Sequence, residues 1–264
     1  MAHPARSFGD HLREWRQRRR LSQLDLALEA EISTRHLSFV ETGRSLPSRE
    51  MVLRLAERLE VPLRERNLLL VAAGYAPVFP ERRLDDPALQ AARQAVELVL
   101  AGHEPYPAVA VDRHWTLITA NRAVPPLLAG VDEALLAPPV NVLRLSLHPN
   151  GLAPRIANLP EWRSHLLDRL RRQVELTADP VLVELFGELS DYPAPRRAGA
   201  PSRQEDHAGV VVPLRLATAH GTLSLFSTTT VFGTPVDVTL SELALESFFP
   251  ADRTTADTLR ALCP

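Results

Sequence analysis

The sequence contains one cysteine, Cys263, and no lysine among its 264 residues. A single cysteine excludes a disulfide framework and a cysteine-based zinc site within one chain, and such scarcity is typical of a protein from a reducing compartment. Every strongly basic side chain is arginine. GC-rich coding accounts for this more simply than a function does.

Long apolar runs are also missing. No stretch reaches the roughly 18 apolar residues of a membrane-spanning helix, and the N-terminal residues MAHPARSFGDHLREW are charged where a secretory signal would be apolar. We therefore expect a soluble, cytoplasmic bacterial protein with no membrane contact. With 45% hydrophobic residues the chain can bury one large core or two modest ones, and its length favours two domains.

The common catalytic and nucleotide-binding motifs are absent from the sequence: it has no Walker-type loop, no glycine triad after a strand and no G-x-S-x-G elbow. The histidines lack the spacing of metal ligands, and His103-Glu104 is followed by Pro105 and Pro107, which excludes a helix-borne metal pair. We expect no enzymatic activity, no cofactor and no metal site.

The net charge of -2 conceals an uneven distribution. Residues 1–80 hold 13 arginines against 10 acidic residues, whereas residues 81–264 hold 17 arginines against 22 acidic residues. The N-terminal part is therefore the basic part. Its excess of positive charge is small, so alone it would bind the phosphates of DNA only weakly.

Short amphipathic helices crowd this basic part. Apolar residues recur at helical spacing, while Ser22, Ser33 and Ser48 stand where they can cap helices and Gly43 stands where one can end. The pattern predicts five helices, over residues 8–19, 23–30, 34–42, 49–61 and 63–74.

The second and third of these helices are separated only by the residues EIS. Helices joined by so short a turn cross steeply, which is the geometry of a helix-turn-helix that presents its second helix to the DNA major groove. The apolar residues of the pair then face the core; they are Leu26, Ala27, Ile32, Leu37 and Val40.

The segments LSQLDLA, LSFVETG and PSREMVLRLAERLEV resemble the five-helix DNA-binding domain of phage repressors and Xre-type bacterial regulators. The resemblance implies an all-α helix-turn-helix domain in residues 1–75, with a salt bridge between Arg16 and Glu41. It also implies DNA contacts: phosphate by Gln23, base edges by Thr34, Arg35 and Ser38, the DNA backbone by His36 and Arg44, and a thymine methyl by Phe39.

Two of these assignments have a structural alternative. Gln23 lies at a helix start, a place that suits phosphate and equally suits an ordinary solvated glutamine. Phe39 is either an exposed contact residue or a partly buried core residue, and the sequence does not separate the two.

Residues 76–102 are predicted to be a linker and a connecting helix. Three prolines and a charge run fill GYAPVFPERRLDDP, and Asp86 with Pro87 then starts a helix that ends at Gly102. Its apolar stripe can pack on its own domain or on a second copy of the chain, and periodicity leaves both alternatives open.

Strands and helices alternate in residues 103–264, which we expect to form an α+β domain with an antiparallel sheet covered on one face by helices. The order is similar to that of a PAS sensor domain. Pro213 places its strand at an edge or a bulge, because proline cannot donate to a ladder. The predicted strands are 106–112, 114–121, 209–218, 221–235 and 236–247, and the main helices are 161–177 and 179–190.

Two further features belong to this part of the chain. The polar, proline-rich segment 191–207 is predicted to be a mobile loop. The arginines of the helix 161–177 lie opposite its apolar stripe and are expected to face solvent; they are Arg163, Arg169, Arg171 and Arg172.

The segments WRSHLLDRLRRQ and FSTTTVFGTPVDVTLSELALESFFPAD also resemble the MmyB-like ligand-binding domain that follows an Xre-type head in bacterial regulators. The resemblance implies a small apolar ligand of fatty-acid type. Expected lining residues are Val109, Val111, Leu117, Leu214, Leu225 and Ser227, and the candidate partners for a carboxylate are Arg144, His148 and Arg155. The apolar residues can equally be close-packed core without a cavity.

Together these patterns predict a sequence-specific DNA-binding transcriptional regulator that senses a small apolar ligand. One recognition helix reads only a few base pairs, so we expect a homodimer on double-stranded DNA with a two-fold symmetric operator. The alternative is a helix-turn-helix interaction module, antitoxin-like or polymerase-recruiting, without an effector ligand.

Overall fold

The computed structural model describes residues 6–177, 179–193 and 212–263, which form two compact units. The first unit contains the residues up to Arg83 together with Thr234–Ser241, and the second contains Leu84–Gly233 and the residues from Glu242 on. Residues 194–207 of the predicted loop and residues 209–211 of a predicted strand lie outside the described residues.

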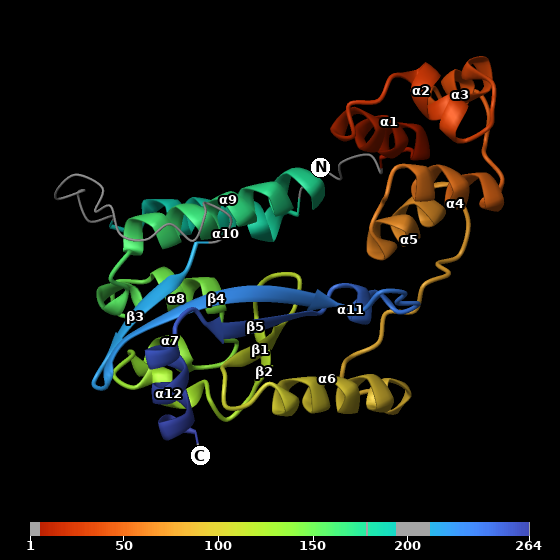
Figure 1. Ribbon diagram of the computed structural model, residues 1–264. Helices are drawn as coiled ribbons and strands as arrows, with labels where there is room; N and C mark the ends of the chain where they lie inside the picture. Colours follow the sequence, from red (N-terminus) through yellow and green to blue (C-terminus); the bar gives the residue numbers. More distant parts are fainter. Residues whose placement is uncertain (1–5, 178, 194–211, 264) are drawn as a thin grey trace. The chain divides into compact units, whose positions relative to one another are not determined.

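Five helices form the N-terminal part of the first unit, as the sequence predicts (Figure 1). Four of them are capped by a serine side chain that accepts a hydrogen bond from the backbone N–H of the third residue on, namely Ser7, Ser22, Ser33 and Ser48. The helices are α1 (Phe8–Arg18), α2 (Gln23–Glu29), α3 (Thr34–Glu41), α4 (Arg49–Arg58) and α5 (Leu63–Ala72).

Helices α2 and α3 form the expected helix-turn-helix. Between them Glu31 adopts a left-handed conformation with φ of 56°, which lets the chain reverse before the cap of α3. The predicted inward-facing residues Leu26, Ala27, Leu37 and Val40 are buried, and Ile32 packs against the same core.

Helix α1 packs so closely on α3 that Gly9 has no room for a side chain, since a Cβ there would lie 2.4 Å from the Glu41 carbonyl oxygen. The Glu41 carboxylate is fully shielded from solvent. It accepts hydrogen bonds from Arg16 Nε at 2.6 Å and Nη2 at 3.0 Å, and from Gln23 Nε2 at 2.8 Å. The predicted Arg16–Glu41 salt bridge is confirmed, and one buried carboxylate joins α1, α2 and α3.

The second unit is built on a five-stranded antiparallel sheet with the strand order β2-β1-β5-β4-β3. The α+β, PAS-like class is thereby confirmed. β3 lies at an edge of the sheet, as predicted, and Pro213 comes directly before the strand. The strands are β1 (Ala108–Val111), β2 (Leu117–Ala120), β3 (Leu214–Thr218), β4 (Gly221–Val231) and β5 (Ala244–Pro250).

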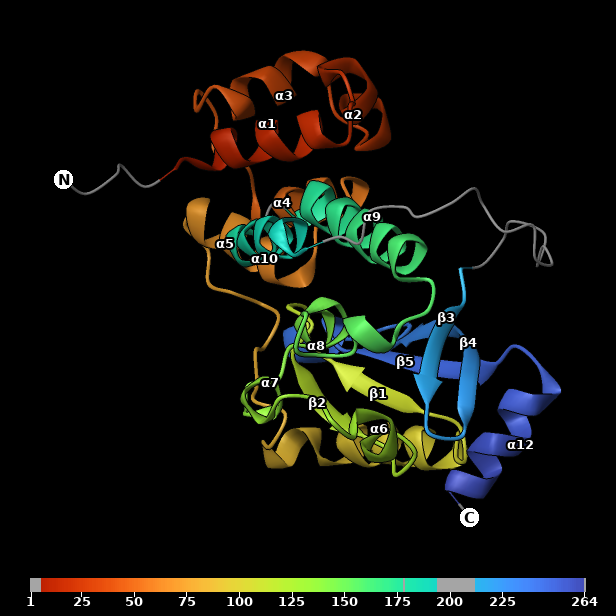
Figure 2. The same cartoon turned by 90° about the vertical axis from the view of Figure 1, so that its left-hand side faces the viewer.

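Helices cover both faces of this sheet rather than the single face expected (Figures 1 and 2). On one face α8 (Val142–Leu147) and α9 (Leu159–Thr177) pack through a large apolar core, with α10 (Pro180–Asp191) against α9. On the other face α6 (Gln90–Gly102) packs on β1 and β5. The connecting helix therefore covers its own domain.

Short elements complete the second unit. They are the 3-10 helices η1 (Pro87–Leu89), η2 (Pro125–Leu128) and η3 (Ala153–Arg155), and the helices α7 (Glu133–Leu136) and α12 (Arg253–Leu262).

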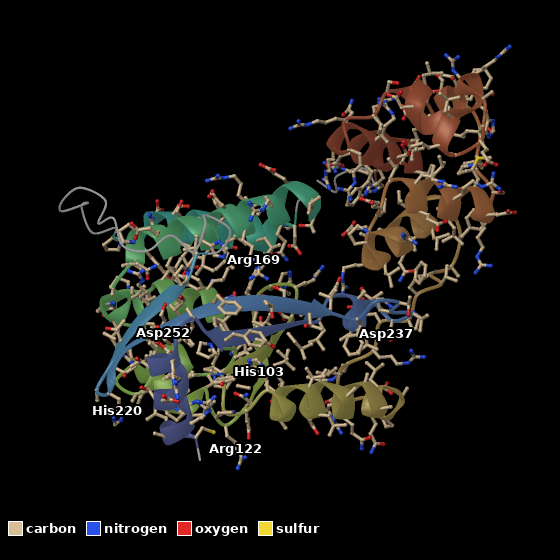
Figure 3. All side chains as sticks on the ribbon, in the orientation of Figure 1. His103, Arg122, Arg169, His220, Asp237 and Asp252 are labelled. Atoms are coloured by element: carbon tan, nitrogen blue, oxygen red, sulfur yellow. The ribbon has the colours of Figure 1, made fainter. Side chains whose placement is uncertain are left out.

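The predicted strand 236–247 is wrong in its first half. Asp237 instead caps a short helix, α11 (Val238–Ser241). The Asp237 side chain is buried and pairs with Arg82 at 3.1 Å (Figure 3), and the first N–H of α11 donates to the Pro80 carbonyl oxygen at 2.9 Å. These contacts make the connection between β4 and β5 part of the first unit.

Replacing Glu41 with alanine should lower the free energy of unfolding of the first unit by about 3–5 kcal/mol, because the nearly buried Arg16 loses its partner. Urea unfolding, followed by hydrogen exchange of the α1–α3 amides in the full chain, measures this loss. The matched control is Glu50→Ala, since Glu50 also pairs with an arginine but its side chain is 84% exposed. That variant should lose less than about 1 kcal/mol, and equal losses would contradict the role given to Glu41.

Candidate DNA interface and ligand cavity

Apart from Gln23 at the start of α2, the residues expected to touch DNA lie on α3 and just beyond its end, and they differ in exposure. Arg35 and Arg44 are exposed, whereas the others are half-buried, namely Thr34, His36, Ser38 and Phe39. The exposed arginines of this surface are therefore Arg35 on α3 and Arg44 just beyond its end.

The ring of Phe39 lies close to both of these arginines. The guanidinium carbon of Arg35 is 5.3 Å from the ring centroid and that of Arg44 is 6.0 Å away, distances within the range of cation–π attraction. The Arg44 backbone N–H donates to the Phe39 carbonyl oxygen at 2.8 Å, which turns the chain back toward α3. Phe39 is thus half-buried, and its ring contacts two exposed arginines.

Two of the expected DNA-contacting side chains have partners within the first unit. Gln23 donates to the buried Glu41 carboxylate, and His36 Nε2 lies 3.3 Å from the sulfur of Met51. The orientation of Gln23 at the start of α2 is thereby fixed. The DNA contacts of all these residues stay predictions.

A cavity of about 120 Å³ lies in the second unit, between the sheet and the helices α8 and α9. Strands β1, β3, β4 and β5 contribute its floor, and η2, α8 and α9 contribute side chains from above. Its lining is apolar except for Ser146, Arg169, Ser227 and Glu246. An apolar cavity of similar size, about 150 Å³, can hold benzene.

Four of the six predicted lining residues line this cavity: Val109, Leu214, Leu225 and Ser227. Val111 is buried in the same apolar core and Leu117 packs against that core, but neither lines the cavity. Close packing and a cavity therefore occur side by side on this face of the sheet.

The three residues expected to hold a ligand carboxylate are engaged elsewhere. Arg144 forms a bidentate pair with Glu188 at 2.6 to 2.9 Å and holds the pKa of that carboxyl below its ordinary value. Arg155 donates to backbone carbonyl oxygens, and His148 Nδ1 accepts a backbone N–H at 3.0 Å. None of the three lines the cavity.

The charges at the cavity belong instead to Arg169 on α9, labelled in Figure 3, and to Glu246 on β5. Arg169 Nη2 donates to the Glu246 carboxylate and, at 2.7 Å, to the Thr229 hydroxyl, which itself donates to Glu246 at 2.8 Å. The guanidinium carbon lies 4.5 Å from the centroid of the Trp115 ring. Glu246 is only 4% exposed, so its charge needs these partners.

Placing Arg169 on a solvated helix face was wrong, because its side chain is only 25% exposed. Two signals in the sequence could have identified it. Arg169 lies three residues after Leu166 and one before Leu170, at the edge of the apolar stripe of α9. Glu246 is an acidic residue within the apolar strand segment LALESFF, where a charge requires a partner.

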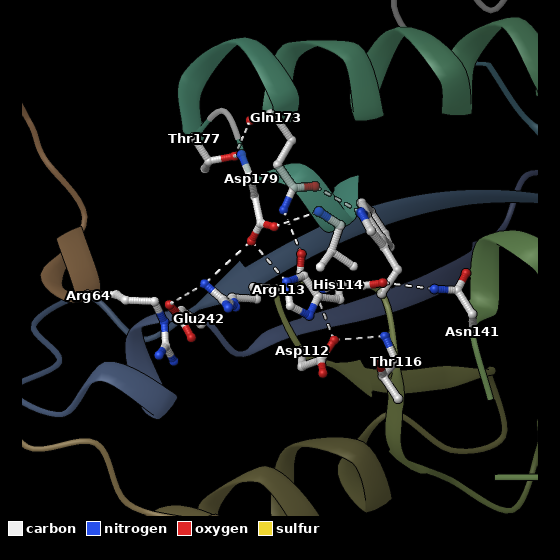
Figure 4. Close-up of polar contacts among 12 residues, drawn as sticks. Arg64, Asp112, Arg113, His114, Thr116, Asn141, Gln173, Thr177, Asp179 and Glu242 are labelled. Carbon is white, nitrogen blue, oxygen red and sulfur yellow. Dashed lines mark hydrogen bonds and ion pairs between the residues drawn. The ribbon is translucent and has the colours of Figure 1, made fainter. Parts of the chain in front are cut away.

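Trp115 forms part of the cavity wall. It is held by a polar cluster whose members Arg113, His114, Gln173 and Asp179 are labelled in Figure 4. The Trp115 indole N–H donates to Gln173 Oε1 at 2.8 Å, and Gln173 Nε2 donates to the Arg113 carbonyl oxygen at 2.9 Å. Asp179, the cap of α10, lies 2.9 Å from His114 Nε2 and 3.4 Å from Arg113 Nη1. The turn between β1 and β2 is thus held against the junction of α9 and α10.

Within residues 6–177, 179–193 and 212–263, no group of three or more His, Cys, Asp or Glu side chains could hold a metal ion. No helix in the same ranges is long and apolar enough to cross a membrane.

Comparison with known protein families gives two matches along the chain. Residues 7–69 match a helix-turn-helix domain. Residues 92–262 match the MmyB-like transcription regulator ligand binding domain, and this match covers more than half of the chain.

The similarity to individual proteins is more limited, either in the length matched or in the structural score. RghRB of Bacillus subtilis (strain 168), named an HTH-type transcriptional regulator, is 39% identical over 75 residues, which are 28% of this chain and 52% of RghRB. The chain therefore matches about half the length of this curated relative. A solved RNA-binding light-oxygen-voltage receptor is similar over 96% of this chain and 62% of its own, with 12% identity and a TM-score of 0.30. That score is too low to show a shared fold.

Asp179→Asn should destabilise the second unit by about 1–2 kcal/mol at neutral pH, because the cap of α10 loses its charge and its pairing with His114. Burial alone would raise the pKa of Asp179, but the hydrogen bonds from His114 and the Val181 N–H hold it below its ordinary value. A carboxyl whose pKa is lowered by folding stabilises the folded state at any pH above the pKa it has in the unfolded chain. This stabilisation is lost as the pH falls through the pKa of the carboxyl in the folded protein.

The difference in stability between this variant and the wild type should therefore shrink below about pH 4. Thermal unfolding across a pH series measures it. Asp132→Asn, which changes the cap of α7 without a histidine or arginine partner, is the control. A difference for Asp179→Asn that stays constant to about pH 3 would contradict the ionic contribution.

Proposed function

We propose that this chain, which belongs to the MmyB-like transcription regulators, is a DNA-binding regulator controlled by a ligand. In this proposal the first unit binds double-stranded DNA in the cytoplasm through α3, and the second unit binds a small apolar, fatty-acid-like ligand that controls this binding. One observation is the main support for this proposal. Strands β4 and β5 both line the apolar cavity, and the segment that connects them belongs to the helix-turn-helix unit.

The exposed surface of α3 supports the DNA-binding half of the proposal. Arg35 and Arg44 can donate bidentate hydrogen bonds to guanine or phosphate, and their contact with Phe39 restricts their conformations. Side chains that are ordered beforehand lose less entropy on binding. Because one recognition helix reads few base pairs, the proposal includes a homodimer on a two-fold symmetric operator with half-sites about 34 Å apart.

The connection between β4 and β5 supports control of the DNA-binding unit by the cavity. Both strands contribute side chains to the cavity wall, while Thr234–Ser241 between them is anchored by the pair of Asp237 and Arg82. The chain thus passes between the units three times: after Arg83 and on either side of this segment. A ligand that prefers one arrangement of the two strands shifts the population toward it, and the segment carries that shift into the first unit.

The lining of the cavity supports an apolar ligand. Burial of hydrocarbon contributes about 25 cal/mol for each Å² removed from water, and the few polar groups can orient one end of a ligand. A volume of about 120 Å³ suits a short hydrocarbon chain. The proposal assigns no catalytic step to this site.

Arg35→Ala should weaken binding to an operator by about tenfold or more and relax the base preference, since a bidentate arginine–base contact contributes about 1–3 kcal/mol. Gel-shift titration of the full chain on the DNA upstream of its own gene, at fixed salt, measures both effects. Arg253→Ala removes the same charge from a position on α12 whose side chain is 94% exposed, and it should leave the affinity nearly unchanged. Unchanged affinity and base preference in Arg35→Ala would remove α3 from the proposal.

Benzene and short-chain lipids should raise the melting temperature of the full chain, and native mass spectrometry should detect the bound lipids, because a ligand that binds only the folded state stabilises it. Leu225→Trp fills the cavity and should abolish both signals. Leu98→Trp makes the same change on α6, at a residue that is 74% exposed and does not line the cavity, and should retain them. If no probe produces either signal with the wild type, the ligand half of the proposal fails.

A further inference from the structure

The two charged side chains at the cavity wall neutralise each other. Glu246 accepts hydrogen bonds from Arg169 and Thr229, and within the described residues both hydrogen bonds that Arg169 donates come from Nη2. The other guanidinium N–H groups of Arg169 donate no hydrogen bond within these described residues, and Ser227 adds a hydroxyl to the lining. The wall therefore offers hydrogen-bond donors and acceptors with no net charge.

A ligand carboxylate would upset this balance. It would either take Arg169 from Glu246, which leaves a buried carboxylate unpaired, or place a second negative charge beside the pair. Both arrangements are unfavourable where apolar walls exclude water and screening is weak. An uncharged head group avoids this cost, because it can accept from Arg169 and donate to Glu246 or Ser227.

We propose that the ligand is a short apolar molecule with an uncharged hydrogen-bonding head, such as an alcohol or a primary amide. Arg169, Glu246 and Ser227 select this head against a carboxylate. The inference rests on the proposed ligand-binding function and narrows its fatty-acid-like class to neutral derivatives. The volume of about 120 Å³ keeps the chain of the ligand short.

Hexan-1-ol, hexanamide and hexanoate test this selection, because they share one hydrocarbon chain and differ in the head group. Calorimetric titration of the full chain at neutral pH should give affinities for the alcohol and the amide at least about tenfold above that for hexanoate. Benzene, which has no head group, reports independently whether the cavity accepts an apolar molecule.

Glu246→Gln should reverse the preference. Arg169 keeps a hydrogen-bond acceptor in this variant but loses the balancing charge, so hexanoate should become the tightest of the three probes. The double variant Arg169→Gln/Glu246→Gln removes both charges and should again favour the neutral heads. Glu184→Gln, the same change at an exposed residue of α10 outside the cavity lining, should behave like the wild type.

The inference is overturned if hexanoate binds the wild type most tightly, or if Glu246→Gln folds and shows no reversal. Should Glu246→Gln not fold, the double variant decides instead, and a preference for hexanoate there overturns the inference. If benzene binds but hexan-1-ol, hexanamide and hexanoate do not, the inference is overturned while the proposed ligand function stands. Failure of benzene and of every other apolar probe refutes the proposed ligand function itself.

Discussion

A carboxylate that is removed from water needs a cation beside it. Among the described residues, a buried glutamate in each unit meets this constraint by joining separate elements through an arginine. In the first unit Glu41 accepts hydrogen bonds from Arg16 and Gln23, so one group sets α1, α2 and α3 relative to one another. In the second unit Glu246 on β5 binds Arg169 and thereby holds α9 against the sheet. The first cluster orients the helix proposed to read DNA, and the second determines the charge at the cavity.

Strand β5 connects the cavity to the rest of the protein. It pairs with both β1 and β4, so it lies inside the sheet, and it contributes Glu246 and Phe248 to the cavity wall. In the proposed function, a ligand that displaces β5 would therefore act on two strand pairs at once, and on the segment Thr234–Ser241 that precedes the strand. The buried Asp237 makes that segment a fixed part of the helix-turn-helix unit.

The sequence predicts what depends on local signals. Serine caps and helical periodicity define α1–α5, and alternating apolar residues define most of the strands. Features that depend on distant partners were missed: Arg169 lies 77 residues from Glu246, and Asp237 lies 155 residues from Arg82. The helical periodicity predicts that Arg169 faces solvent, because this pattern depends only on which residues are polar and contains no information on where a partner such as Glu246 lies. The sequence does not resolve the role of Phe39, because that role depends on ring contacts with Arg35 and Arg44.

The DNA-binding role is tested most directly by selecting sequences from a random pool of double-stranded DNA with the full chain, in the presence and absence of a short neutral apolar ligand. We predict enrichment of a two-fold symmetric sequence with half-sites about 34 Å apart, bound with an affinity that changes when the ligand is added. A pool that stays random, with binding that responds to salt alone, would contradict a ligand-controlled, sequence-specific regulator.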